Sequence, residues 1–407
     1  MKNRPYVFTL LVCLYFSQGL PSGLLAHALP ALMREYCVDL QWIGMIKVLA
    51  LPWFFKFLWA PVIDQRWQRR NWILLFQSCV IPLLLFISLL QPQQLFGDWL
   101  LPFLLTLLLL NSFSASQDIA TDGLAVARLP ERWLGLANTV QVAAYKIGLI
   151  LGGSYLLILL DSLGWHFSFQ LFACLLLLAL LPVVFAHAPK TSHQSQHPVQ
   201  RIGIWRVLWG YLQQPGSGRW LLIIASYKVA DELGSSMLKP LLVDIGLSLT
   251  DIGYMTSIAS GCGLLGAAVS GLLFLRLNTR QALLLFGFLQ ALGIALFAGI
   301  PMLAGQLSAI YAVVMFEQFV DGLSTVVIFA AMMQHCRKGL EGTDYTLQNS
   351  FHLMGMGIAA LLSGFIAKAI GYQSLFISAG IFGVAALALI VFSDDEQLNH
   401  SHRTAAV

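Results

Sequence analysis

The chain has 407 residues, of which 58% are hydrophobic and 10% are charged. A soluble globular protein carries about a quarter of charged residues, so this composition excludes that class. The formal net charge of +4 lies mostly in short polar turns between long apolar runs, and it gives no indication of nucleic-acid binding. The composition indicates a helical protein that crosses a membrane several times.

Twelve apolar runs of about 20 residues predict twelve transmembrane helices and an all-α fold. The first run contains an AHA stretch that resembles a signal-peptidase site. Its apolar character continues past that stretch to about Met33, so we expect a retained helix. The runs cover roughly residues 5–33, 41–62, 71–91, 98–127, 135–160, 166–187, 218–245, 251–275, 281–300, 306–335, 346–368 and 374–392.

The basic residues are concentrated in alternate turns between these runs. The turn after the second run holds Arg66, Arg69 and Arg70, whereas the opposite side holds Arg34. Cytoplasmic loops carry the excess of Lys and Arg, so the pattern predicts that both termini lie in the cytoplasm.

A polar stretch, residues 188–217, divides the runs into six and six. It is rich in Gln, Ser, His and Pro, which is typical of a flexible linker. Within it, IWRVLWGYL predicts a short amphipathic helix on the membrane surface. We expect an N-terminal six-helix bundle (1–187), a cytoplasmic linker (188–217), a C-terminal six-helix bundle (218–393) and a cytoplasmic tail (394–407).

A weak internal repeat relates the two halves. WIGMI (42–46) matches DIGYM (251–255), and QVAAYKIG (141–148) matches QNSFHLMG (348–355). Six plus six helices related by a repeat are typical of transporters in which two bundles move about a site near the membrane midplane.

The loops that follow the second and eighth runs, APVIDQRWQRR and GLLFLRLNTRQ, resemble a loop signature of the major facilitator superfamily. In the first loop Asp64 supplies the acid, and Arg66, Arg69 and Arg70 supply the bases. The second loop has Leu275 in place of the acid. The excess of basic residues in cytoplasmic loops accounts for the three arginines but not for the aspartate that precedes them. We therefore expect these four charged residues of the first loop to form part of a gate.

Several ionisable or amide side chains interrupt the apolar runs near the middle of the bilayer, as judged from a helical rise of about 1.5 Å per residue. An ionisable group at that depth costs at least about 2.5–3.5 kcal/mol, so we expect these side chains to face a shared aqueous cavity. The group comprises Gln18, Lys146, Lys228, Asp231, Glu232, Glu317 and Asp321.

The charges of ASYKVADELG (225–234) have two interpretations. Lys228 precedes Asp231 by three residues and Glu232 by four, which suits ion pairs within one helix. Alternatively, Lys228 binds a ligand and Asp231 is its partner, which is the interpretation that we prefer. Glu232 has no assigned role.

Glu317 and Asp321 share one helical face at a spacing of four residues. Two carboxyl groups held together in a medium of low dielectric constant favour the uptake of one proton, so the pair is a candidate proton-coupling site. The alternative is static pairing with Lys228 or Lys146.

Asp118 and Asp122 form a second acidic pair with the same spacing. They lie toward the cytoplasmic end of their run, as does Lys56. We expect the two aspartates to pair with Arg66, Arg69 or Arg70 and to close a cytoplasmic gate; the alternative is direct contact with substrate.

The sequence shows no nucleotide-binding loop, metal-ligand cluster or nucleophile with an adjacent base. We therefore expect no enzyme activity, no cofactor and no bound metal, and an ion gradient as the energy source. The expected protein is a monomer in a lipid bilayer. Gly19, Pro21 and Gly23 are expected to loosen the first helix around Gln18.

Five stretches, YFSQGLP (15–21), KFLWAPVID (56–64), SASQDIATDG (114–123), YKIG (145–148) and YKVAD (227–231), resemble the AmpG-like branch of the major facilitator superfamily. Within that branch the N-terminal half is most similar to siderophore permeases of the RhtX/FptX type. The resemblance implies import of a ferric siderophore across a bacterial inner membrane, with protons as the coupling ion. The alternative within the branch is a muropeptide permease for cell-wall recycling, and a different class is a membrane sensor that transports nothing.

The resemblance also implies which polar residues line the substrate path or the gate. Lys146 and Lys228 would give an anionic siderophore cationic contacts. Together with the gate residues Lys56, Asp64, Asp118 and Asp122, the shared positions are Gln18, Gln117, Tyr145, Lys146, Tyr227, Lys228 and Asp231.

Overall fold

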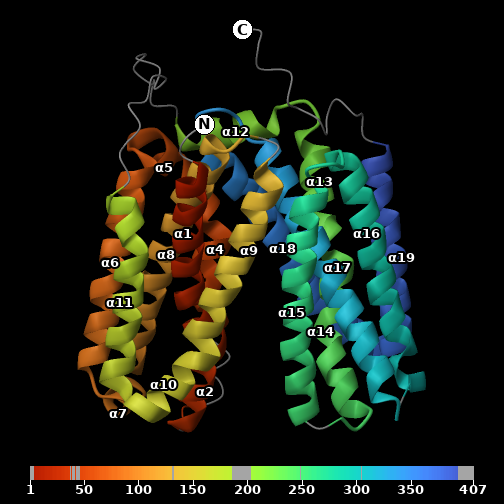
Figure 1. Ribbon diagram of the computed structural model, residues 1–407, viewed down its shortest axis with the longest axis horizontal. Coiled ribbons are helices and arrows are strands. Elements are labelled where there is room, and N and C mark those ends of the chain that lie inside the picture. Colours follow the sequence, from red (N-terminus) through yellow and green to blue (C-terminus); the bar gives the residue numbers. More distant parts are fainter. Residues whose placement is uncertain are drawn as a thin grey trace. The chain divides into compact units, whose positions relative to one another are not determined.

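The computed structural model describes residues 4–36, 38, 42, 46–130, 133–185, 203–247, 249–303 and 305–392. All regular structure in these residues is helical, as Figure 1 shows. The expected tail (394–407) and residues 188–202 of the expected linker lie outside the described residues.

The chain forms two compact units. Unit 1 comprises Met1–Arg128, Val140–Leu208 and Arg337–Thr346. In it α6 packs against α8 and α11, and α1 packs against α8 and α11. Its elements are α1 (Arg4–Gly23), η1 (Leu24–Ala28), α2 (Leu29–Glu35), η2 (Ile46–Ala50), α4 (Leu51–Phe55), η3 (Lys56–Leu58), α5 (Ala60–Arg66), α6 (Arg69–Leu89), α7 (Pro92–Leu95), α8 (Leu100–Arg128), most of α9 (Leu134–Ile150), η5 (Leu151–Tyr155), α10 (Leu156–Leu163), α11 (Trp165–Val184) and the start of α12 (Ile204–Leu212).

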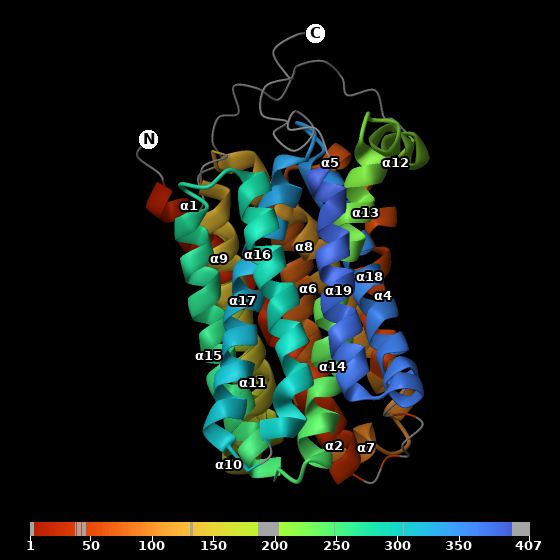
Figure 2. The same ribbon diagram turned by 90° about the vertical axis from the view of Figure 1, so that its right-hand side faces the viewer.

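Unit 2 comprises Leu129–Thr139, Trp209–Cys336 and Leu347–Val407. In it α15 packs against α17, and α16 lies between α17 and α19; Figure 2 shows α16 beside α19. Its further elements are α13 (Ser217–Tyr227), α14 (Val229–Asp244), α15 (Leu249–Leu273), α16 (Thr279–Leu296), η6 (Phe297–Leu303), α17 (Leu307–Gln334), most of α18 (Glu341–Ile370) and α19 (Tyr372–Val391).

Ten helices of the described residues are long and apolar enough to cross a membrane. The two other expected spans are present as interrupted helices. The second span consists of the short elements η2, α4, η3 and α5, and the seventh is divided into α13 and α14. The all-α fold with twelve spans is thus confirmed, with two of the spans broken.

Helices α1 and α9 approach each other at glycines. A Cβ atom at Gly19 would lie 2.2 Å from the Tyr145 carbonyl oxygen, and one at Gly152 would lie 2.0 Å from that of Leu20. Each helix is followed by a π-helical turn, η1 after α1 and η5 (which contains Gly152) after α9, and the two turns pack together. The expected loosening by Gly19, Pro21 and Gly23 is not seen at Gln18 itself, since α1 is α-helical through Gly23 and Gly19 permits close packing, and the helix becomes irregular at the π-helical turn that begins at Leu24.

We predict that Gly152→Ala lowers the free energy of unfolding by roughly 1–3 kcal/mol, because a methyl group at this position overpacks the contact with α1. Gly261→Ala is the matched control, since the space around the Cβ position of Gly261 in α15 is open. Thermal unfolding in detergent measures both variants. Equal stability of the two variants would contradict the proposed backbone contact.

Candidate functional site

The seventh span is broken at a charged residue. Helix α13 ends at Tyr227, Lys228 has the non-helical angles φ −105° and ψ 5°, and α14 begins at Val229. Asp231 lies in the first turn of α14, and its carboxylate is favoured by the partial positive charge of a helix N-terminus. The interruption places a lysine and an aspartate side by side inside an otherwise apolar segment.

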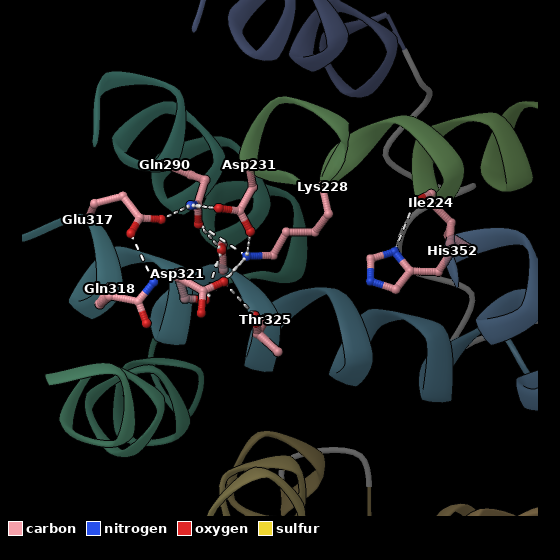
Figure 3. Close-up of polar contacts among 10 residues, drawn as sticks. Ile224, Lys228, Asp231, Gln290, Glu317, Gln318, Asp321, Thr325 and His352 are labelled. Atoms are coloured by element: carbon pink, nitrogen blue, oxygen red, sulfur yellow. Dashed lines mark hydrogen bonds and ion pairs between the residues drawn. The ribbon is translucent and has the colours of Figure 1, made fainter. Parts of the chain in front are cut away.

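The ammonium group of Lys228 contacts two carboxylates and one amide (Figure 3). Its Nζ lies 2.5 Å from Asp321 Oδ1, 3.2 Å from Asp231 Oδ2 and 3.1 Å from Gln290 Oε1. The Lys228 side chain is 3% exposed, whereas that of Asp321 is 21% exposed. Burial at this level strengthens the ion pairs, and it makes the loss of one partner costly.

Gln290 on α16 connects the groups around Lys228. Its Nε2 donates to Asp231 Oδ1 at 2.9 Å and to Glu317 Oε1 at 3.2 Å. Its Oε1 accepts from Lys228 and, at 2.5 Å, from the hydroxyl of Ser324. The amide therefore uses both donors and both acceptor positions, which fixes its orientation.

Glu317 is the most buried acid of this cluster. Its side chain accepts hydrogen bonds from Gln290 and, at 2.9 Å, from Gln318 Nε2. Lys228 thus contacts the carboxylates of Asp231 and Asp321, and Gln290 links Glu317 to the same group. We refer to these residues together with Gln290 as the Lys228 cluster.

The contacts of the Lys228 cluster agree with part of the sequence interpretation. Lys228 forms an ion pair with Asp231 in its own segment, as one interpretation predicted. It also forms an ion pair with Asp321, which was the alternative to a proton-coupling role for that residue. Glu232 does not pair with Lys228; it accepts a hydrogen bond from Ser236 at 3.1 Å. The buried Tyr227 hydroxyl donates to the Leu283 carbonyl oxygen at 2.9 Å, so its observed contact is one between helices.

Unit 1 contains a second buried lysine at a helix interruption. Lys56 lies where α4 gives way to η3, is fully buried and forms an ion pair with Asp118 on α8. Its Nζ also lies 5.1 Å from the centre of the Trp53 ring, a distance suited to a cation–π interaction.

Asp122 lies one turn after Asp118 on the same face of α8. The hydroxyl of Tyr15 on α1 donates to Asp122 Oδ1 at 2.8 Å, and both residues are almost fully buried. The expected pairing of Asp118 and Asp122 with Arg66, Arg69 or Arg70 is therefore wrong. Lys56 and Tyr15 approach α8 from neighbouring elements, Arg69 and Arg70 contact other groups, and Arg66 is exposed.

A charged network at the ends of three spans involves Asp64, near the end of α5, with Arg69 and Glu341, which begin α6 and α18. Its carboxylate accepts from the backbone N–H of Thr343 at 2.6 Å and from the Thr343 hydroxyl at 2.8 Å, so it caps the first turn of α18. Arg69 lies 3.1 Å from Asp64 and 2.5 Å from Glu341. A segment from the second half of the chain thus belongs to unit 1.

The other residues expected at the site lie apart from these networks. Arg70 donates to the carbonyl oxygens of Val183 and Val184, and Arg66 is exposed. Gln18 is buried, and its Nε2 has no partner among the described residues. Tyr145 and Lys146 are half-buried on α9, where Tyr145 interacts with Ser22.

The sequence interpretation did not identify Gln290, Tyr15, Glu341 or Thr343 as partners of the charged residues. A signal for Gln290 exists, because it is an isolated amide within the apolar run LLLFGFLQALGIALF. Buried polar side chains require partners, so an amide at that position points to a polar network. The contacts of Asp64 with Glu341 and Thr343 join residues far apart in the sequence, and no local pattern indicates them.

Membrane-spanning helices with buried ion-pair networks at helix interruptions define the class of secondary transporters. The family model described as the Major Facilitator Superfamily matches residues 11–353, and the chain belongs to this family.

Known relatives and solved structures agree with this assignment. The chain is 26% identical over 391 residues to the anhydromuropeptide permease of Escherichia coli K12, covering 94% of this chain and 78% of the permease. It is 23% identical over 411 residues to the putative transporter AmpG 1 of Rickettsia conorii, covering 93% and 97%. Its fold is similar to that of the fucose:proton symporter FucP of E. coli, with a TM-score of 0.75 and 17% identity over 96% of this chain and all of that one.

We predict that Lys228→Met lowers the free energy of unfolding by about 3–5 kcal/mol, because it leaves buried carboxylates without their cation. Adding Asp321→Asn to that variant should restore part of the loss, since it removes one of those charges. Unfolding in detergent gives both values. Lys146→Met serves as the control on a half-buried lysine, and a loss of stability no larger than in this control would contradict the role of Lys228.

Proposed function

We propose that this chain is a bacterial inner-membrane permease that imports anhydromuropeptides by alternating access. The observation that carries the proposal is its similarity to the E. coli anhydromuropeptide permease along almost the whole chain. Similarity to the putative AmpG transporter of R. conorii over 93% of the chain supports the same branch of the family. The inferred topology, with both termini in the cytoplasm, is part of the proposal.

The expectation of siderophore import gains no support from these comparisons. The resemblance in the N-terminal half suggested RhtX/FptX-type permeases, whereas the relatives described above carry names from the muropeptide branch. The alternative interpretation, a muropeptide permease, therefore replaces the siderophore permease as the proposed function. Sequence stretches shared by a whole branch do not by themselves separate its substrates.

The Lys228 cluster suits the carboxylate end of a sugar–peptide ligand. Asp321 is the most exposed of its ion-paired acids and Lys228 is held at the helix interruption. A peptide carboxylate that approaches Lys228 would replace Asp321 as its partner without leaving the lysine unpaired. Lys146 and Tyr145, which are half-buried in unit 1, are further proposed polar contacts for a ligand of this kind.

The same cluster is the proposed site of proton coupling. Three carboxyl groups around one ammonium leave a surplus of negative charge if all of them are ionised, and a buried net charge is unfavourable. Glu317 is fully buried and its contacts in Figure 3 are amides rather than the lysine. We therefore assign the proton to Glu317, with Asp321 as the acid that exchanges partners when substrate binds.

The Asp64 network is the proposed cytoplasmic gate. Asp64, Arg69, Glu341 and Thr343 attach the first turn of α18 to unit 1 through charge-assisted hydrogen bonds. Opening toward the cytoplasm would break these contacts. Lys56, Asp118 and Asp122 pair internally within unit 1, so we propose that they stabilise the interrupted second span beside the gate.

Uptake in cells tests the proposed substrate. Deletion of the gene should cause loss of labelled anhydromuropeptide uptake and release of muropeptides into the medium, and expression of the chain should restore uptake. Lys228→Met should lower uptake at least tenfold at equal protein level, because the ligand carboxylate loses its cation.

The same cells separate the competing functions. Loss of labelled ferric-siderophore uptake with normal anhydromuropeptide uptake would overturn the proposal in favour of the siderophore permease. Wild-type uptake of both labelled solutes by the deletion cells would overturn the transport proposal and favour a sensor, because a sensor transports nothing.

A further inference from the structure

Helix α12 has two apolar faces. Val207, Leu208 and Tyr211 are buried, and the carbonyl oxygen of Val207 accepts a hydrogen bond from Arg337 at 3.1 Å. On the other side Trp205 is 74% exposed and Trp209 is 61% exposed. The inner face is accounted for by packing, whereas the outer face exposes two indoles at a spacing of one helical turn.

The outer face has the residue types of a membrane interface. Trp205, Trp209 and Leu212 follow a spacing of four and three residues, so they form one stripe along the helix. Arg206 is exposed at the edge of that stripe. A helix in water presents polar side chains on its outer face, while tryptophan flanked by basic residues is characteristic of the boundary between lipid headgroups and acyl chains.

The chain connection places α12 close to the membrane. Four residues separate Leu212 from Ser217, where α13 begins the seventh span, and the five steps between their Cα atoms reach at most about 18 Å. The turn is compact, with Gly216 at φ 83° and the Ser217 hydroxyl 2.7 Å from the Leu212 carbonyl oxygen. Figure 2 shows α12 next to the first turns of α13.

We propose that α12 lies in the membrane interface, with its Trp205–Trp209–Leu212 face inserted at the headgroup boundary and Arg206 bound to the phosphate of an anionic phospholipid. The charge of Arg206 selects anionic over zwitterionic headgroups. This lipid contact does not depend on which solute the protein transports. It makes α12 an anchor at the junction between unit 1 and unit 2, since the chain passes from one to the other within this helix.

Fluorescence quenching tests the insertion of the two indoles. The purified full chain, with its 11 tryptophans, is reconstituted in vesicles whose lipids are brominated near the headgroup end of the acyl chain. The wild type should lose a larger fraction of its emission than the variant Trp205→Phe/Trp209→Phe, which keeps the apolar character of the face. Trp220→Phe is the control, because Trp220 is buried in α13.

The result that overturns the insertion is equal quenching of the wild type and the double variant, together with quenching of the same two indoles by aqueous acrylamide. That result is expected if this face binds another protein, which the lipid-only vesicles lack.

A second measurement tests the headgroup contact. Phosphatidylglycerol, compared with phosphatidylcholine, should raise the Tm of the wild type, and Arg206→Gln should lose most of that gain while Arg206→Lys keeps it. An undiminished gain in Arg206→Gln would refute the contact.

Discussion

The ion pair between Lys228 and the carboxylates of Asp321 and Asp231 is the interaction on which the rest of unit 2 depends. An ammonium group inside an apolar span is tolerated only when it is paired and hydrogen-bonded. The break between α13 and α14 brings Lys228 to Asp231, α17 supplies Asp321, and α16 supplies Gln290. Three elements are therefore held in register by one buried charge. Under the proposed function, a ligand carboxylate that replaced Asp321 would bind through the same interaction that stabilises the unit.

Unit 1 repeats this arrangement with different residues. Lys56 lies at an interruption of the second span, is fully buried and pairs with Asp118, while Asp122 accepts from Tyr15. In both units a lysine at a helix break meets an acid on a long continuous helix, α8 or α17. Interrupted helices next to buried charge are typical of transporters, since the break supplies backbone groups and local freedom where a solute binds. In each unit the buried lysine thus lies at a helix interruption, and its acidic partner lies on an uninterrupted helix.

Much of the fold and part of the site follow from the sequence. Apolar runs predict twelve spans, and depth counting identifies Lys228, Asp231, Glu317 and Asp321 as buried charges, because apolar length and charge position are local properties. The partner of each charge is not local. Asp118 pairs with Lys56 rather than with an arginine of the nearby loop, and Asp64 caps a helix that begins 277 residues later, at Glu341. Such choices depend on helix rotation and on close contacts such as that of Gly152 with Leu20, which a single sequence does not reveal.

Substrate identity is likewise not encoded in the stretches shared by a family branch, and comparison with relatives moved the interpretation from siderophores to anhydromuropeptides.

The central claim is that the acids around Lys228 couple anhydromuropeptide import to proton movement. The most direct measurement is the internal pH of proteoliposomes that contain a pH-sensitive dye, after substrate is added outside. The wild type should acidify the lumen as substrate enters. Glu317→Gln should abolish this acidification and still exchange labelled for unlabelled substrate, because binding at Lys228 remains intact. Acidification of equal extent in Glu317→Gln, or substrate accumulation by the wild type with no movement of protons, would contradict the account.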